Sequence, residues 1–252
     1  MNTQQALYTY LLRLGDDALI LGHRLSEWCS RGPILEEDLA LTNMALDQTG
    51  RAQVLLQLAA QIEGKNKTAD DLAYKRGERQ FLNHLICELP NGDFAITMAR
   101  QWIFSVYEFE IYQALCHSAH PELAAIAKKA IKEIRYHLAH ARDWCLRLGN
   151  GTAYSHEKMQ QAFNELWMYT GELFNMDECD EVLIAEGFVP DKSAIKSKWL
   201  DQVTSILTEA TLQVPVVDYM QQGGIKGIHT EHLGHLLSEM QYLQRAYPDA
   251  KW

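Results

Sequence analysis

Residues 130–140 read Ala-Ile-Lys-Glu-Ile-Arg-Tyr-His-Leu-Ala-His, and this stretch decides the fold class. It lies inside a longer run, 121–148, in which apolar residues return every three or four positions. That spacing places them on one side of an α-helix. Pro121 suits the first turn of such a helix, and the glycines of 149–151 are a typical ending. The run therefore predicts one long amphipathic helix.

Three further segments, 4–29, 36–62 and 93–118, carry the same periodicity, and the third begins after a turn at 91–93 that ends with Asp93 as a candidate N-cap. In the first, the apolar residues follow one another at steps of four and three positions: Leu7, Leu11, Leu14, Ala18, Leu21, Leu25 and Trp28. Gly15 and Gly22 lie off this stripe, where they either allow a neighbouring helix to approach closely or weaken the helix slightly. Each of the four segments would span roughly 35–42 Å as a helix.

Strand signals are nearly absent, so an all-α fold is predicted. The four long helices form a long four-helix bundle over about 4–148, and additional C-terminal helices follow over about 155–246, the last of them over 230–246. A connection between the second and third helices holds a short helix near 70–82. We expect one domain, 1–252, since 252 residues bury a large core.

The overall composition is that of an ordinary globular protein, with 47% hydrophobic and 22% charged residues. The net charge of −10 argues against nucleic-acid or anionic-membrane partners, which require concentrated lysine and arginine. The five cysteines are widely spaced and odd in number, which favours reduced thiols in a cytoplasm. We expect no signal peptide and no membrane span.

The helix at 121–148 also raises the question of a metal. Two irons in a helix bundle require one Glu from each of two helices and one Glu-x-x-His from each of two others. Three residues before His137 stands Ile134, which cannot bind iron. On the second helix, Asp47 is followed three residues later by Gly50 instead of histidine. Asp47 and His137 are therefore candidates for vestigial ligand positions.

The remaining two helices offer no better ligands. On the first, Asp16, Asp17 and Glu27 lie beside the apolar stripe, whose middle contains Leu21. On the third, Ser105 lies on the inner edge, and Glu108 is expected to point away. Because a buried carboxylate without a metal is costly, such acids are kept only where they have a role. The sequence thus predicts no metal site and no catalytic residue in this chain.

Two alternative metal constellations stand beside this interpretation. Glu133 and His137 share a helical face at four-residue spacing. In the tail, three residues share a face that would suit zinc: His232, His235 and Glu239. A structural role is favoured instead, with Thr230 as N-cap and Glu231 in the first turn of a partner-facing helix. The predicted partner-facing residues of the tail are His229, Glu231, His232, Tyr242, Tyr247 and Trp252.

Several long motifs resemble one known family. They include 14–17 (LGDD), 24–29 (RLSEWC), 46–50 (LDQTG), 79–81 (RQF), 90–94 (PNGDF), 130–137 (AIKEIRYH), 146–152 (LRLGNGT), 229–234 (HTEHLG) and 239–245 (EMQYLQR), with the closing Trp252. Along essentially the whole chain, they resemble the C subunits of bacterial phenylacetyl-CoA 1,2-epoxidases, in the phenylacetic acid catabolic protein family.

The resemblance implies a ferritin-like helical bundle in the cytoplasm. It implies a non-catalytic structural subunit that pairs with a homologous A subunit, which carries the di-iron site and binds the CoA thioester. A separate reductase subunit with flavin and an iron–sulfur cluster supplies electrons from NADPH. The complex inserts one oxygen atom of O₂ into the aromatic ring as an epoxide. The A-subunit ligand positions correspond here to Ile20 or Leu21, Asp47, Gly50, Ser105 and Ile134, with His137 alone retained.

Two other functions stay open at this point. One is an autonomous di-iron oxygenase or iron-binding ferritin-like bundle, which the missing carboxylates disfavour. The other is a helical adaptor unrelated to aromatic degradation, which co-purification with the A subunit would exclude. The aromatic tail also predicts that removing residues 229–252 weakens the complex, through loss of contact with a partner or with the end of the bundle.

Overall fold

The computed structural model describes residues 1–248 and residue 250. These residues form eleven α-helices and four short 3₁₀ turns and contain no strand, so the all-α prediction is confirmed. The chain separates into two compact units, one made of Met1–Pro90 with the chain from Gln222 onward, and one made of Asn91–Gln221. The expectation of a single domain therefore stays a prediction. None of the described helices is both long and apolar enough to cross a lipid bilayer.

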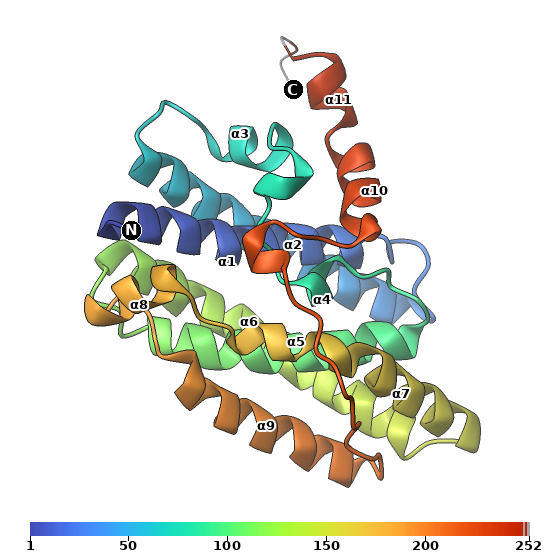
Figure 1. Ribbon diagram of the computed structural model, residues 1–252. Coiled ribbons are helices and arrows are strands. Elements are labelled where there is room, and N and C mark those ends of the chain that lie inside the picture. The colour runs from blue at the N-terminus through green and yellow to red at the C-terminus, as the bar shows by residue number, and fades with distance from the viewer. Residues whose placement is uncertain (249, 251–252) are drawn as a thin grey trace. The chain divides into compact units, whose positions relative to one another are not determined.

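The first unit is built on an antiparallel pair of long helices, α1 (Thr3–Ser26) and α2 (Leu35–Glu63) (Figure 1). A Cβ atom at Gly15 would lie 2.8 Å from Leu56 Cδ2, and one at Gly22 would lie 3.1 Å from Thr49 Oγ1. The two glycines therefore allow α2 to approach α1 closely, which decides between the two roles that the sequence left open. Of the predicted apolar stripe, every member on α1 is buried.

The connection after α2 contains α3 (Ala69–Tyr74), a 3₁₀ turn at Glu78–Gln80 and α4 (Leu85–Glu88), where the sequence predicted one helix near 70–82. Helix α3 begins with a reciprocal capping box between Thr68 and Asp71. It ends early because the Arg76 side chain turns back to the carbonyls of Leu72 and Gln80 and to the Asp16 carboxylate of α1.

The C-terminal segment of the first unit carries α10 (Glu231–Met240) and α11 (Tyr242–Ala246). The apolar side of α10, formed by Leu233, Leu236 and Leu237, is buried, and α10 contacts α4 and the 3₁₀ turn at Glu78–Gln80. The sequence predicted one helix over 230–246. The break falls at Gln241, whose buried side chain donates to the carbonyl oxygens of Ala73 and Arg76, each at 3.1 Å.

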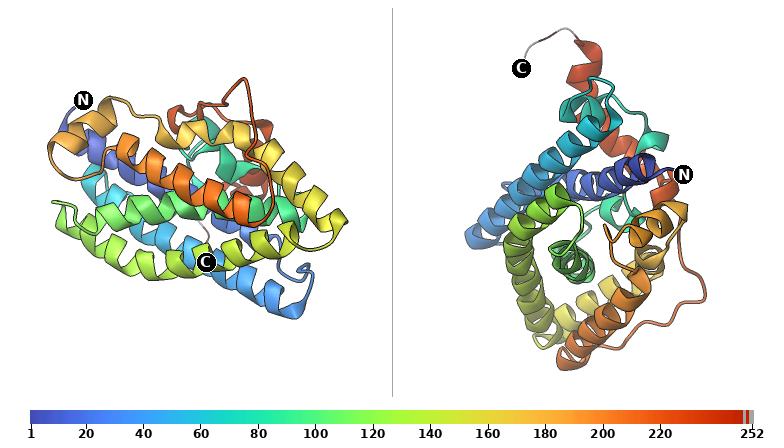
Figure 2. Two further views of the ribbon diagram at one scale, coloured as in Figure 1. Left: turned by 90° about the horizontal axis from the view of Figure 1, so that it is seen from below. Right: turned by 90° about the vertical axis from the view of Figure 1, so that its left-hand side faces the viewer.

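The second unit is organised around α5 (Phe94–Leu115), which is antiparallel to α6 (Pro121–Gly149). Helices α7 (Ala153–Leu166) and α9 (Lys192–Glu209) also contact α5, while α8 (Glu178–Ala185) lies between them in sequence (Figure 2). Because it is surrounded, α5 buries 17 of its 22 residues.

Local chemistry fixes the ends of the second unit's helices as predicted. Asp93 is the N-cap of α5 and accepts from the Ile96 amide at 3.0 Å, and Pro121 opens α6. A Cβ atom at Gly149 would lie 2.6 Å from the Ala210 carbonyl oxygen, so glycine is required where α6 ends against the end of α9. The four long helices thus form two antiparallel pairs, one in each unit, consistent with the ferritin-like fold class.

Candidate functional site

The predicted ligand positions of the first unit lie on α1 and α2. On α1, Ile20 and Leu21 are buried, at 0% and 1% exposure. On α2, Asp47 is partly exposed and Gly50 is exposed, with no atom within 4 Å of the place a Cβ would occupy. The buried polar side chains of this turn are Gln48 and Arg51, one residue later than the sequence predicted. The pair retains the three-residue spacing of an acid-x-x-His element.

The chemistry of Gln48 and Arg51 is wrong for a metal. A guanidinium group has no acceptor lone pair and stays protonated in proteins, so Arg51 cannot bind a cation and repels one. A neutral amide is a weak iron ligand compared with a carboxylate. The residues at the buried i, i+3 positions of α2 therefore do not fit a di-iron centre. Sequence periodicity missed them because Asp47, an obvious acid, stands next to Gln48.

The second unit carries the other predicted positions. Ser105 on α5 is 1% exposed, and Ile134 and His137 on α6 are both 0% exposed. Glu108, which the sequence placed on the outer side of α5, is buried at 4% exposure, like most residues of this helix. Glu133, the alternative partner of His137, is partly exposed. Ile134 thus fills with a hydrocarbon side chain the position that the predicted motif assigns to a carboxylate.

No group of three or more His, Cys, Asp or Glu side chains within metal-binding distance occurs in the described part of the chain. This holds for the tail as well as for the long helices. The zinc alternative named His232, His235 and Glu239, and the structure does not bring them together as a ligand set. The roles of Asp47 and His137 as vestigial positions stay predictions.

Buried carboxylates are present in the first unit, but they are paired with protein groups. Asp16, which the sequence placed beside the apolar stripe, is fully buried and forms a two-pronged ion pair with Arg76. Its Oδ2 also accepts from the Leu82 amide at 2.8 Å. Burial raises the pKa of Asp16, although the Arg76 charge acts in the opposite direction. The carboxylate therefore fastens the α3–α4 connection to α1.

Asp17, the next residue, joins α1 to the same connection at His84, just before α4. Its Oδ1 accepts from the His84 amide at 2.7 Å, and its Oδ2 lies 2.8 Å from His84 Nδ1. Both residues are buried, at 3% and 2% exposure. Two adjacent acids on α1 thus satisfy polar groups that lie at least 60 residues later in the chain.

The densest polar cluster surrounds Glu88, at the end of α4. Its side chain is completely buried and accepts four hydrogen bonds, at 2.7–2.8 Å. The donors are Asn83 Nδ2, a ring nitrogen of His229, and both the amide and the hydroxyl of Thr230. Thr230 is the N-cap residue of α10, as predicted, but its hydroxyl donates to Glu88 and makes no capping hydrogen bond to the helix.

His229 is held between two acceptors. Its Nδ1 lies 2.8 Å from Glu88 Oε2, and its Nε2 lies 2.8 Å from the Phe81 carbonyl oxygen. Both ring nitrogens must therefore donate, which requires the doubly protonated imidazolium. Burial by itself lowers the pKa of His229, but the hydrogen bond and charge of Glu88 outweigh burial, and the pKa is raised. The ring is internal to the fold, whereas the sequence placed it at a partner surface.

Arg24 of α1 completes this cluster, which we call the Glu88 clamp and define as Arg24, Asn83, Glu88, His229 and Thr230. The Arg24 guanidinium donates to the Glu88 carbonyl oxygen from Nε at 3.0 Å and from Nη2 at 2.8 Å, and to the His232 carbonyl oxygen at 3.2 Å. The clamp therefore joins α1, α4 and the start of α10 through charged and hydrogen-bonded groups.

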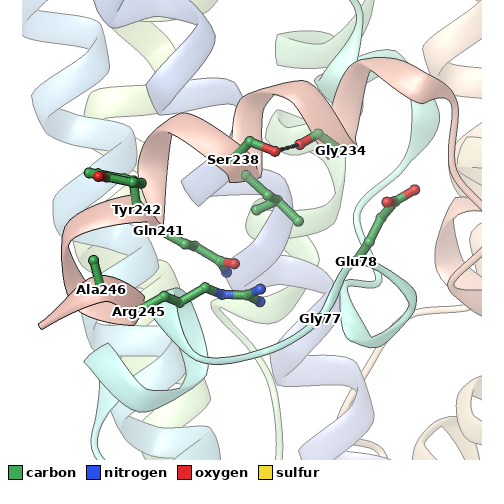
Figure 3. A pocket seen from close by; sticks show the side chains of 9 residues that line it. Gly77, Glu78, Gly234, Ser238, Gln241, Tyr242, Arg245 and Ala246 are labelled. Carbon is green, nitrogen blue, oxygen red and sulfur yellow. Dashed lines mark hydrogen bonds between the residues drawn. The ribbon is translucent and has the colours of Figure 1, made fainter. Parts of the chain in front are cut away.

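A groove of about 620 Å³ lies between the Gly77–Glu78 turn and helices α10 and α11 (Figure 3). Gln241 and Arg245 both line it, and both donate to the carbonyl oxygen of Arg76, at 3.1 and 2.8 Å. Its polar groups thus hold the tail in place. Tyr242 and Tyr247 of the predicted interface are 63% and 58% exposed, and Glu231 is exposed as well. Trp252 lies outside the described residues.

Comparison with known proteins covers the whole chain. A family model described as Phenylacetic acid catabolic protein matches residues 1–252. The chain is 50% identical over 246 residues to the C subunit of the 1,2-phenylacetyl-CoA epoxidase of Escherichia coli (strain K12). The aligned region is 98% of this chain and 99% of that relative. The resemblance found in the sequence motifs is therefore confirmed over nearly the full length of both proteins.

Proposed function

Because this chain belongs to the phenylacetic acid catabolic protein family, we propose that it is a non-catalytic structural subunit of a phenylacetyl-CoA 1,2-epoxidase. In this role it pairs with a homologous A subunit that holds the di-iron centre, and it stabilises that subunit during aerobic phenylacetate degradation. The relative that matches end to end is itself the C subunit of such an epoxidase.

One observation carries the non-catalytic part of the proposal. The buried i, i+3 positions of α2 are Gln48 and Arg51, and the corresponding positions of α6 are Ile134 and His137. A di-iron centre needs a carboxylate followed by a histidine at each pair, but α2 offers a neutral amide and a cation, and α6 offers a hydrocarbon in place of the carboxylate. The buried carboxylates of the first unit, Asp16 and Glu88 among them, are occupied in joining segments of the fold.

The cofactors of the proposed complex therefore belong to other subunits. The A subunit supplies the di-iron centre, and a reductase subunit supplies flavin, an iron–sulfur cluster and electrons from NADPH. This chain holds none of them and works in the cytoplasm. Its contribution is a rigid helical surface on which the catalytic partner folds and remains soluble.

The test is co-expression of this chain with the A subunit of the same epoxidase. We expect the two to co-purify in near-equal amounts, and we expect epoxidation of phenylacetyl-CoA only when the A subunit and the reductase are both present. An A subunit that is equally soluble and active without this chain would contradict the proposal. Iron bound at about two per chain by this protein alone would favour an autonomous di-iron oxygenase instead.

A further inference from the structure

The outward side of α2 carries no charge over most of its length. From Leu39 to Gln61, every exposed residue is uncharged: Leu39, Asn43, Leu46, Thr49, Gly50, Gln53, Val54, Gln57 and Gln61. Leu39 is 55% exposed and Leu46 is 65% exposed. The solvent side of a surface helix is normally its charged side. This side of α2 therefore has the composition of a protein contact, in which charged residues are depleted.

Helix α6 of the same protein provides the comparison. Both helices have 29 residues. The exposed residues of α6 include seven charged side chains, namely Glu122, Lys128, Lys129, Lys132, Arg135, Asp143 and Arg147. The absence of charge on α2 is thus not a property of long helices in this chain. It belongs to one side of one helix.

The spacing of the exposed residues indicates what covers them. Leu39, Asn43, Leu46, Gly50, Gln53 and Gln57 follow one another at steps of four, three, four, three and four, and we call this line the uncharged face. Alternating steps of three and four residues form a straight contact line for a second α-helix. Gly50 lies at its centre, with no atom within 4 Å of the place a Cβ would occupy, which leaves room for close approach.

The charges beside this line decide between possible occupants. The charged side chains of α2 that are at least partly exposed are all acidic: Glu36, Asp38, Asp47 and Glu63. Arg51 is the helix's one basic residue, and it is only 3% exposed. Pairing two copies of α2 would bring acidic rims together on chains of net charge −10. A partner with basic residues beside its contact line meets no such repulsion.

We propose that the uncharged face of α2 is the docking surface for one long α-helix of the catalytic partner, uncharged along its contact line and flanked by lysine or arginine. This inference rests on the proposed function, which supplies the partner. The stretch from Leu39 to Gln57 is about 28 Å long as a helix. A single helix contact of that length buries less than the ~800 Å² per partner of a standard interface, so neighbouring surfaces add to it.

The experiment uses the full-length chain co-expressed with the epoxidase A subunit. Leu46→Arg and Gly50→Arg each place a long cation on the uncharged face, and Tyr154→Arg on α7 is the matched control, since Tyr154 is 71% exposed. We expect both face variants to bind the A subunit at least tenfold more weakly and the control to bind like wild type. Lone chains with Leu46→Arg or Tyr154→Arg should keep the wild-type unfolding temperature, because these side chains are exposed. Gly50→Arg should not lower the unfolding temperature, because arginine is a better helix former than glycine.

A second pair of variants tests the charge of the partner. Gln57→Lys should weaken binding more than Gln57→Glu, because the expected rim of the partner is basic. The opposite order, or wild-type affinity for Leu46→Arg and Gly50→Arg, would overturn the docking proposal while leaving the proposed function intact. A wild-type chain that does not bind the A subunit would overturn both. A lone chain that is dimeric, and that Leu46→Arg makes monomeric without loss of A binding, would assign the face to a second copy.

Discussion

Replacing Glu88 with glutamine is expected to lower the free energy of unfolding by about 3–5 kcal/mol, the usual loss when a buried charge pair loses one partner. The variant keeps the size of the side chain and removes only its charge and one acceptor. It acts on the Glu88 clamp, which joins the start of α10 to α1 and α4.

The magnitude follows from the four hydrogen bonds that the carboxylate accepts. Each bond to a charged group contributes roughly 1.5–3 kcal/mol. A glutamine that keeps its oxygen toward Thr230 retains two of them in weaker form. Its amide nitrogen then faces Asn83 Nδ2 and the His229 ring, which are both donors. Losing two charge-assisted bonds gives about 3–6 kcal/mol, which agrees with the estimate of about 3–5 kcal/mol for a broken buried charge pair.

The assay is urea unfolding of the lone chain together with hydrogen exchange of the backbone amides in α10. We expect exchange in α10 to accelerate more than exchange in α5, because the clamp belongs to the first unit. Glu231→Gln is the control, since Glu231 is exposed at the start of α10, and it should change stability by less than about 0.5 kcal/mol. A Glu88→Gln variant that unfolds like this control would refute the reasoning.

Three further predictions concern single residues. Since the pKa of His229 is raised in the folded protein, the folded state binds this proton more tightly than the unfolded state does. The contribution of His229 to the free energy of unfolding should be complete below pH 6.5 and should disappear as pH rises through the raised pKa. A pH series of urea unfolding should show this dependence in the wild-type chain and lose it in His229→Gln. Gly149→Ala should destabilise by about 1–3 kcal/mol against the Ala210 carbonyl, whereas Gly50→Ala should stabilise by about 0.5–1 kcal/mol, and comparable unfolding temperatures for the two would contradict the packing argument. His137→Ala should leave the iron content of the assembled complex unchanged by metal analysis, and a loss of iron would show that the ring reaches a metal.

The long helices were predictable because their signal is local. Repeating apolar residues such as Leu7, Leu11 and Leu14 place α1 within a few residues of its observed bounds, and the same holds for the other three. Caps such as Asp93 and Pro121 act over a single turn, so the sequence shows them directly. A resemblance carried by motifs along the whole chain added the family.

The polar interior of the first unit was not predictable, because its partners are distant in sequence. Nothing near Asp16 or Asp17 indicates that Arg76 and His84 will pair with them, because these partners lie at least 60 residues later in the chain. The acids were therefore placed beside the apolar stripe. Likewise Glu88 meets His229 across 141 positions, and only the fold shows that this histidine is internal.

The sequence could not show to within one residue which side of α2 is buried. Asp47 and Gln48 are adjacent, and a helix turns about 100° per residue, so a shift of one position moves the buried side across that angle. Asp47 was predicted as a ligand position because it is an acid, whereas the buried polar residues of this turn are Gln48 and Arg51. Neither position gives α2 a histidine ligand, because glycine has no side chain and the arginine side chain cannot bind a cation.

The most direct test is the iron content of the purified lone chain after anaerobic incubation with excess Fe(II) and removal of loosely bound metal. If Arg51 and Ile134 occupy positions that a di-iron centre would need, the chain should retain far less than one iron per molecule, while the A subunit treated alongside it retains iron. Retention of about two irons per chain, with a di-iron spectroscopic signature, would contradict the account.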